Sequence, residues 1–176
     1  MPYARNALDG NQVYFEDAGD NGAAVVLHGG LVDSVDLVRG SNFAQALQEH
    51  PEEFRLIYVD HRGVGRSDKP HEVEAYAMQL RAADAVAVLD ELGIERAHFI
   101  GNSWGGRLGF GEYAPDRVLS LAIGGQQPYA IDPEGPLAHA VTEALGGSRR
   151  QQGGLEPFVE VLESFAGCRR CCGIAG

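Results

Sequence analysis

Residues 97–106 read Ala97-His98-Phe99-Ile100-Gly101-Asn102-Ser103-Trp104-Gly105-Gly106, and the predicted architecture is built around them. The apolar run Ala97–Ile100 has the pattern of a buried strand, and a G-x-S-x-G sequence follows it directly. Glycines on both sides of a serine allow a sharp strand-to-helix turn that leaves the hydroxyl exposed. We therefore interpret Ser103 as a nucleophile at such a turn. The alternative is a glycine-rich turn that contains an incidental serine.

Similar apolar runs occur elsewhere in the chain. Three lack polar alternation, as expected for strands covered on both faces: Ala23–Leu27, Leu56–Val59 and Val118–Ile123. Met78–Leu92 has apolar residues at three- and four-residue steps and is followed by Gly93, which predicts a helix. A further strand is predicted at Asn11–Glu16, entered through an Asp9-Gly10 turn. The alternation of predicted strands and helices along the chain indicates an α/β fold. We expect a mostly parallel central sheet with helices on both faces, and the Ala97–Ile100 strand in its middle.

The loop after the first apolar run reads His28-Gly29-Gly30-Leu31. Acyl transfer builds negative charge on the substrate oxygen, and backbone N–H groups aimed at that oxygen stabilise it. We expect the amides of Gly30 and Trp104 to form such an oxyanion hole and to point toward the Ser103 hydroxyl. In the alternative interpretation the two glycines only turn the chain. His28 itself is predicted to be a buried, hydrogen-bonding residue.

A second glycine-rich loop, residues 60–67, reads Asp60-His61-Arg62-Gly63-Val64-Gly65-Arg66-Ser67. It lacks the Lys-Ser/Thr pair of a phosphate-binding P-loop, and its glycines do not form G-x-G-x-x-G. We interpret it as a structural turn in which Asp60 and Arg62 bond neighbouring loops. The sequence therefore predicts no cofactor.

Three motifs, HGGL, DHRGVGRSDKP and GNSWGGRLGF, occur in this order between about Asn11 and about Gln127. With them the sequence resembles the α/β-hydrolase family. The resemblance implies that fold, Ser103 as the nucleophile and an oxyanion hole from Gly30 and Trp104. Most members hydrolyse esters or related acyl compounds without a cofactor, and the resemblance implies this reaction here as well. Lactonases, peptidases, thioesterases, C–C bond hydrolases and cofactor-free haloperoxidases share the fold, so the fold alone does not choose among these reactions.

The candidate acid and base of a catalytic triad follow the serine at an unusually short sequence spacing in this chain. In the family an acid and a histidine follow the serine in that order. His139 is the only histidine after Ser103, and Asp132 precedes it, so His139 and Asp132 are the candidate base and acid. Apolar residues at helical spacing surround His139, which favours a plain helical histidine over a catalytic one. We therefore predict that no histidine nitrogen lies within about 3.2 Å of the Ser103 hydroxyl.

We expect the family's C-terminal strands to be missing, with the chain truncated after the start of a lid. Residues 1–130 are predicted to form the N-terminal part of a hydrolase core, 131–167 a helical lid-like segment and 168–176 an atypical Cys/Arg tail. The tail holds all three cysteines, Cys168, Cys171 and Cys172, and no histidine follows His139 to complete a zinc site. No metal site is predicted. A shifted reading frame is our hypothesis for the origin of the tail.

Composition restricts the partners. The 14 basic and 25 acidic residues give a formal charge of −11, which makes nucleic acid an unfavourable partner. No apolar run has the length of a membrane span and the first residues lack the apolar stretch of a signal peptide, so we expect a cytoplasmic protein. If later strands are absent, an open sheet edge or the lid helices would favour a homodimer.

Two functions remain open. In the first, the protein is a serine hydrolase that cleaves carboxylic esters or related small, apolar acyl substrates. In the second, it is a truncated, non-catalytic α/β-hydrolase homologue that binds small apolar ligands and has at most vestigial activity.

Overall fold

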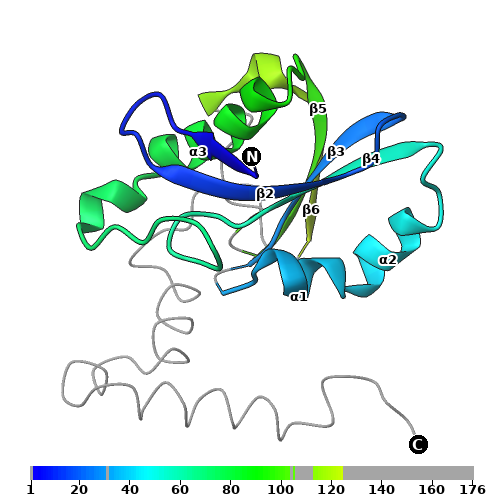
Figure 1. The fold of residues 1–176 in the computed structure, drawn as a ribbon, viewed down its shortest axis with the longest axis horizontal. Helices are drawn as coiled ribbons and strands as arrows, with labels where there is room; N and C mark the ends of the chain where they lie inside the picture. The colour runs from blue at the N-terminus through cyan, green and yellow to red at the C-terminus, as the bar shows by residue number, and fades with distance from the viewer. Residues whose placement is uncertain (1, 31, 104, 106–112, 125–176) are drawn as a thin grey trace, which may run out of the picture. The chain divides into compact units, whose positions relative to one another are not determined.

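The structure is a computed structural model that describes residues 2–30, 32–103, 105 and 113–124 (Figure 1). The chain divides into two compact units, Met1–Pro128 and Tyr129–Gly176, and every described residue belongs to the first. The predicted lid-like segment 131–167, the tail 168–176 and the candidate triad residues Asp132 and His139 lie outside the described residues.

A six-stranded sheet forms the centre of the described part of the chain, in the order β1-β2-β4-β3-β5-β6. Its strands are β1 (Tyr3–Arg5), β2 (Gln12–Ala18), β3 (Ala23–His28), β4 (Phe54–Val59), β5 (Ala97–Asn102) and β6 (Val118–Gly124). β3 is parallel to β4 and β5, and β5 is parallel to β6. β2 is antiparallel to both β1 and β4. The prediction of an α/β fold with a mostly parallel sheet is confirmed.

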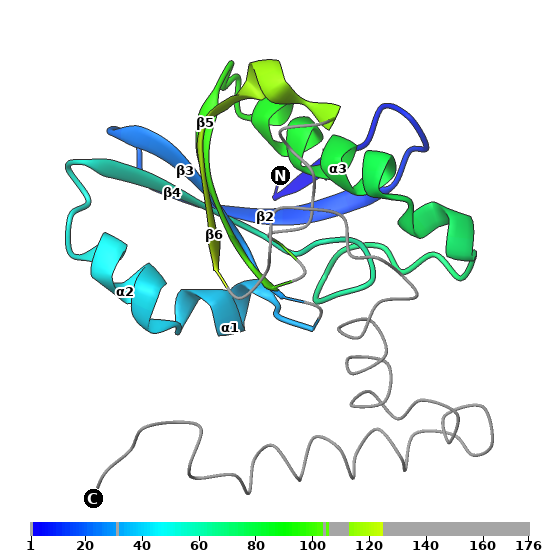
Figure 2. The ribbon, with the colours of Figure 1, turned by 180° about the vertical axis from the view of Figure 1, so that it is seen from behind.

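Helices cover both faces of this sheet. α1 (Val35–Arg39) and α2 (Asn42–Gln48) lie on one face, and α3 (Met78–Glu91) lies on the other (Figure 2). Two short 3-10 helices, η1 (Val73–Tyr76) and η3 (Pro115–Arg117), precede α3 and β6. None of the helices in these described ranges is long and apolar enough to cross a membrane.

Alternate residues of β3 belong to two separate cores. Val26 packs in the cluster that contains Val88 of α3, whereas Val25 and Leu27 pack in the cluster that contains Val35 of α1. A strand buried on both faces needs apolar side chains at every position. This explains why β3 shows no polar alternation in the sequence.

The place of β5 in the sheet differs from the prediction. β5 lies between β3 and β6, one strand from the edge of the described sheet, and the middle positions belong to β4 and β3. An apolar run indicates that a strand is covered on both faces, but it carries no information on how many strands lie beyond its neighbours.

Candidate active site

Ser103 lies in the tight turn that the sequence predicts. β5 ends at Asn102, and Ser103 follows with a φ of 49°, the only positive φ of a non-glycine residue among those described. This left-handed conformation is unfavourable for a residue with a Cβ atom, and strain of this kind clusters at functional sites. Ser103 is also exposed to solvent. The predicted strand-to-turn geometry is therefore confirmed, while the role of Ser103 as nucleophile stays a prediction.

The turn after β5 packs closely on the turn after β3. A Cβ atom on Gly105 would lie 2.4 Å from the Gly29 carbonyl oxygen and 2.6 Å from the His28 carbonyl oxygen. Neither backbone oxygen can move away cheaply, so only glycine fits at this position. The second glycine of the G-x-S-x-G motif thus brings the two turns into a single site.

Gly30 borders Ser103 in this site. A Cβ atom on Gly30 would lie 3.6 Å from the Ser103 Cβ. The Gly30 N–H donates a hydrogen bond to Asp33 Oδ2 at 2.7 Å, and the Gly30 carbonyl accepts one from His61 Nε2 at 2.9 Å. Trp104, the second expected oxyanion donor, lies outside the described residues. The oxyanion hole stays a prediction, and its Gly30 amide is bonded to Asp33 in this structure.

Two buried histidines, His28 and His61, contact the backbone of the turn after β3. The rings of His28 and His61 stack with centroids 5.1 Å apart and planes inclined by 14°. Burial lowers the pKa of His28 well below its usual value, and the neighbouring His61 adds to the shift. Burial also lowers the pKa of His61, as does the charge of Arg81. Both imidazoles are therefore held neutral, and the prediction of His28 as a buried, hydrogen-bonding residue is confirmed by its burial and its contact with the Gly29 carbonyl.

The loop after β4 is fixed by a buried carboxylate. Asp60 accepts hydrogen bonds from the backbone N–H of Val35 at 2.5 Å and of Arg66 at 2.8 Å. The first bond fastens the start of α1, and the second closes the glycine-rich turn on itself. Asp60 thus bonds a neighbouring loop, as predicted.

Arg62 has the same kind of role deeper in the fold. Its fully buried side chain donates to both Asp84 carboxylate oxygens, at 2.6 and 2.7 Å, and to Asp9 at 2.7 Å. Burial raises the pKa of Asp84 against the lowering effect of this arginine. These bonds join the loop after β4 to α3 and to the turn between β1 and β2. The interpretation of residues 60–67 as a structural turn is confirmed.

The described residues provide no general base for Ser103. No hydrogen bond joins the Ser103 hydroxyl to any histidine of the described ranges, which hold His28, His50, His61, His71 and His98. The Nδ1 atom of His98 lies 2.7 Å from the Ser120 hydroxyl on β6. Since His139 and Asp132 lie outside the described residues, the candidate base and acid stay predictions.

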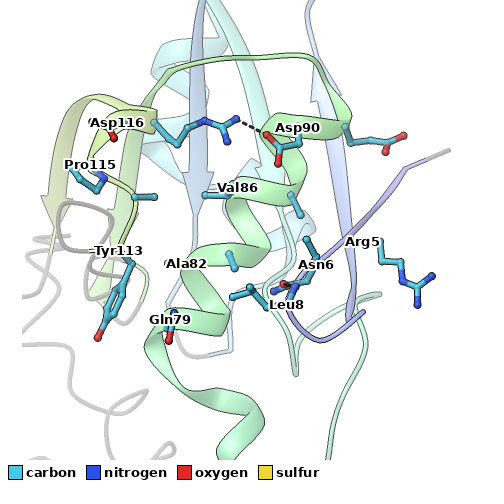
Figure 3. A pocket seen from close by; sticks show the side chains of 16 residues that line it. Arg5, Asn6, Leu8, Gln79, Ala82, Val86, Asp90, Tyr113, Pro115 and Asp116 are labelled. Carbon is cyan, nitrogen blue, oxygen red and sulfur yellow. Dashed lines mark hydrogen bonds and ion pairs between the residues drawn. The ribbon is translucent and has the colours of Figure 1, made fainter.

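A cavity of about 660 Å³ lies elsewhere, on the outer side of α3 (Figure 3). It lies between α3, the turn that joins β1 to β2, and η3. Asp90 is at one end of the cavity and forms a 2.7 Å ion pair with Arg117. Its lining, as far as the described residues go, contains no serine, threonine, cysteine or histidine, and neither Ser103 nor Gly30 belongs to it. This cavity is therefore not a candidate active site.

The only cluster of possible metal ligands in the described part of the chain is also remote from Ser103. Its members, His50, Glu52 and Glu53, have ligand atoms within 4.8 Å of one another and are all exposed. They precede β4 and so lie at the amino end of the parallel strands, whereas Ser103 follows the carboxyl end of β5. Among the described residues, none forms such a ligand set at Ser103.

A parallel sheet with a strained serine turn after one of its strands defines a hydrolase-type α/β scaffold. Residues 23–146 match the family described as the alpha/beta hydrolase fold, and the chain belongs to that family.

Individual relatives carry hydrolase names. The chain is 41% identical to bifunctional epoxide hydrolase 2 of Mus musculus over 71 residues, which are 39% of this chain and 13% of that protein. It is 36% identical to the putative carbamate hydrolase RutD of Caulobacter sp. (strain K31) over 105 residues, 56% of this chain and 35% of that protein. The crystal structure of epoxide hydrolase A from Mycobacterium thermoresistibile superposes with a TM-score of 0.62 at 28% identity, covering 78% of this chain and 42% of that one. The chain therefore spans less than half the length of each of these proteins.

Proposed function

We propose that this protein is a serine hydrolase that cleaves carboxylic esters or related small, apolar acyl substrates with Ser103 as the nucleophile. The observation that carries the proposal is the exposed Ser103 in a left-handed turn after β5, directly beside Gly30. A chain maintains a strained backbone where the function needs it, and a serine presented in this way is accessible to a substrate carbonyl. Membership of the α/β-hydrolase fold family and the hydrolase names of the relatives support the reaction class.

The proposed reaction has two halves. In the first, Ser103 Oγ attacks the carbonyl carbon, its proton passes to a general base, and the carbonyl oxygen becomes an oxyanion. Collapse of the tetrahedral intermediate breaks the ester bond, and the leaving alcohol takes the proton from the base. In the second half water attacks the acyl-enzyme, restores Ser103 and releases the acid. His139 and Asp132 are the proposed base and acid, the amides of Gly30 and Trp104 are the proposed oxyanion donors, and no cofactor takes part.

Epoxide hydrolysis is the competing reaction, because two of the relatives carry that name. Attack of a serine oxygen on an epoxide carbon would open the ring and leave an ether between protein and substrate. Water does not readily cleave an ether, whereas it does cleave the ester that acyl transfer leaves on serine. The serine at position 103 therefore favours a carbonyl substrate.

A non-catalytic homologue that binds small apolar ligands is the second candidate function. The observation that favours it is that no described histidine hydrogen-bonds Ser103. A serine hydroxyl without an adjacent base is a weak nucleophile. Under this alternative the wild-type protein hydrolyses esters no faster than its Ser103→Ala variant.

A homodimer through the sheet edge and a cytoplasmic location belong to the same proposal. β6 is the last strand of the described sheet, and its Leu119 and Leu121 are 48% and 39% exposed. Exposed apolar side chains on the last strand of the described sheet would favour pairing with another chain. A second copy of this protein is the partner that we propose.

A direct test uses p-nitrophenyl butyrate and styrene oxide with the wild-type protein, Ser103→Ala and the control Ser120→Ala. We expect ester hydrolysis by the wild-type protein and Ser120→Ala, and background rates in Ser103→Ala. The loss is on the order of a million-fold if a complete triad forms. Mass spectrometry after treatment with a fluorophosphonate should locate the adduct on Ser103. Equal ester rates in the wild type and Ser103→Ala would support the non-catalytic alternative, and Ser103-dependent opening of styrene oxide would overturn the acyl assignment.

A further inference from the structure

We propose that Asp33 is an inhibitory carboxylate in this site: it occupies the Gly30 N–H and must leave it before an oxyanion can bind. The inference rests on the proposed function, since it concerns the donor that acyl transfer would use. Asp33 belongs to none of the motifs that indicate the family. It lies in the loop between β3 and α1, and its side chain reaches the Gly30 N–H.

The carboxylate lies at the distance from the Gly30 nitrogen at which an oxyanion would bind. Asp33 Oδ2 lies 2.7 Å from the Gly30 nitrogen, and a donor must lie 2.7–3.1 Å from the developing oxyanion to stabilise it. The point where a Gly30 Cβ would stand is 3.0 Å from Asp33 Oδ2 and 3.6 Å from the Ser103 Cβ. The carboxylate oxygen and the serine therefore face the same side of Gly30. A substrate oxygen cannot use this donor while Asp33 holds it.

The loop is shaped to receive Asp33. A Cβ atom on Gly29 would lie 2.4 Å from the Asp33 Cβ, so a side chain at position 29 would exclude the aspartate from its place. Both glycines of the His28-Gly29-Gly30 sequence thus accommodate Asp33: Gly29 leaves space for it, and Gly30 donates its N–H to its carboxylate. The Gly29 contact involves the Asp33 Cβ and so brings residue 33 close to Gly30, while the hydrogen bond from the Gly30 N–H holds the carboxylate itself.

The Gly30 backbone is fixed from the opposite side. His61 Nε2 donates to the Gly30 carbonyl at 2.9 Å, and the His61 ring is buried against His28. Asp33 is only half-buried. A half-buried side chain changes rotamer at lower cost than a buried backbone contact breaks. Release of the donor therefore occurs through rotation of Asp33, and the amide stays in place for the oxyanion.

A purely structural role for Asp33, as a cap on the turn from Gly30 to Asp33, makes the opposite prediction. Removal of a cap loosens the Gly30 turn and lowers both stability and turnover. Removal of an inhibitory carboxylate frees the N–H and also removes a negative charge beside the developing oxyanion. The sign of the change in kcat therefore separates the two roles.

The test measures kcat and KM for p-nitrophenyl butyrate in the wild type, Asp33→Ala, Asp33→Asn and the control Asp36→Ala. Asp36 is exposed and bonds Arg66 outside the site. We expect kcat to rise about tenfold or more in Asp33→Ala, because a hydrogen bond to a charged group no longer competes, with little change in KM. Asp33→Asn should lie between Asp33→Ala and the wild type, since a neutral acceptor binds the N–H about half as strongly. Inhibition by butylboronic acid, which forms a tetrahedral adduct on serine, should strengthen in the same order.

The amide proton of Gly30 gives a readout that does not depend on turnover. We expect an NMR resonance shifted downfield in the wild type and moved upfield in Asp33→Ala. Ser103-dependent wild-type activity combined with unchanged or lower kcat in both Asp33 variants would overturn the inference and leave the proposed function standing. If Asp33→Ala does not fold, the isosteric Asp33→Asn decides. Absence of Ser103-dependent turnover in every protein, Asp33→Ala included, would overturn the proposed function and the inhibitory role together.

Discussion

The turns after β4 and β5 lie at the same end of the sheet and are organised in opposite ways. In the loop after β4, Asp60, Arg62 and Ser67 are all buried and hydrogen-bonded. In the turn after β5, Ser103 is exposed and its backbone is in the left-handed region. The first loop stabilises the fold through satisfied polar contacts, and the second turn holds a residue in a conformation that costs stability.

The two turns therefore contribute differently to the site: the loop after β4 stabilises it, and the turn after β5 presents the serine. A strained serine persists only if the surrounding structure is rigid enough to determine it. The Arg62 network supplies rigidity by joining α3, the loop after β4 and the turn between β1 and β2. Changes on the two sides of the comparison should therefore have opposite effects on stability.

The largest effect is expected for Arg62→Ala. Removal of this side chain leaves Asp84 buried without its charged partner, and loss of one member of a buried ion pair costs about 3–5 kcal/mol. Urea unfolding followed by circular dichroism measures the change. Arg66→Ala, an exposed arginine of the same loop, is the matched control and should have a much smaller effect. Similar losses in both variants would mean that the buried network is not the stabilising element.

The second largest effect is expected from the protonation of the two buried histidines, His28 and His61, which changes the stability of the fold with pH. Burial lowers the pKa values of His28 and His61 below the ordinary 6.5, so below that pH the unfolded chain binds protons that the folded chain rejects. The free energy of unfolding should therefore fall between pH 7 and pH 5, with a slope of at most about 1.4 kcal/mol per pH unit for each histidine. Protonation of Asp84, whose pKa burial raises, acts in the opposite direction.

Urea unfolding at several pH values measures this slope. His28→Gln should flatten it, and the exposed His50→Gln is the comparison variant outside the stacked histidine pair. An equal slope in the wild type and His28→Gln would assign the pH dependence to other groups.

The smallest effect is a gain in stability. Ser103→Gly removes the Cβ atom that makes the left-handed conformation costly, and we expect the free energy of unfolding to rise by about 0.5–1 kcal/mol after the greater freedom of glycine in the unfolded chain is included. Ser103→Ala keeps the Cβ atom and should show no such gain. Thermal unfolding of both variants measures the difference, and a loss of stability in Ser103→Gly would indicate that position 103 is not strained.

Most strands and the long helix could be predicted because their burial is visible locally, whereas β6, which was predicted to be covered on both faces, is exposed at most of its positions. Apolar runs such as Ala23–Leu27 and the three- and four-residue spacing in Met78–Leu92 record how each element is covered. The three-residue β1 and the short α1 and α2 were not predicted, since each is too short for a period to emerge. A usable signal was present at α2: Ser41 precedes it, and its hydroxyl accepts a hydrogen bond from the Ala44 N–H.

The site was predicted only as far as its motifs extend. Ser103, Gly30 and Gly105 fall in patterns with a known steric reason, so their proximity could be expected. Asp33 and His61 contact Gly30 from opposite sides, but nothing in their sequence spacing indicates it. The Asp33 contact forms within one turn, between residues three positions apart. The His61 contact depends on how two loops far apart in the chain meet, which is a property of the folded sheet.

The order of strands in the sheet also governs how the chain emerges from the ribosome. β3 lies between β4 and β5, so its edge toward β4 stays unpaired until synthesis has passed Val59, and its edge toward β5 stays unpaired for the longer interval until synthesis has passed Asn102. At ordinary translation rates of about 5–20 residues per second, this interval lasts roughly 4–15 s. During that time a strand of almost wholly apolar sequence has at least one open edge, which is the condition under which nascent chains aggregate or recruit chaperones.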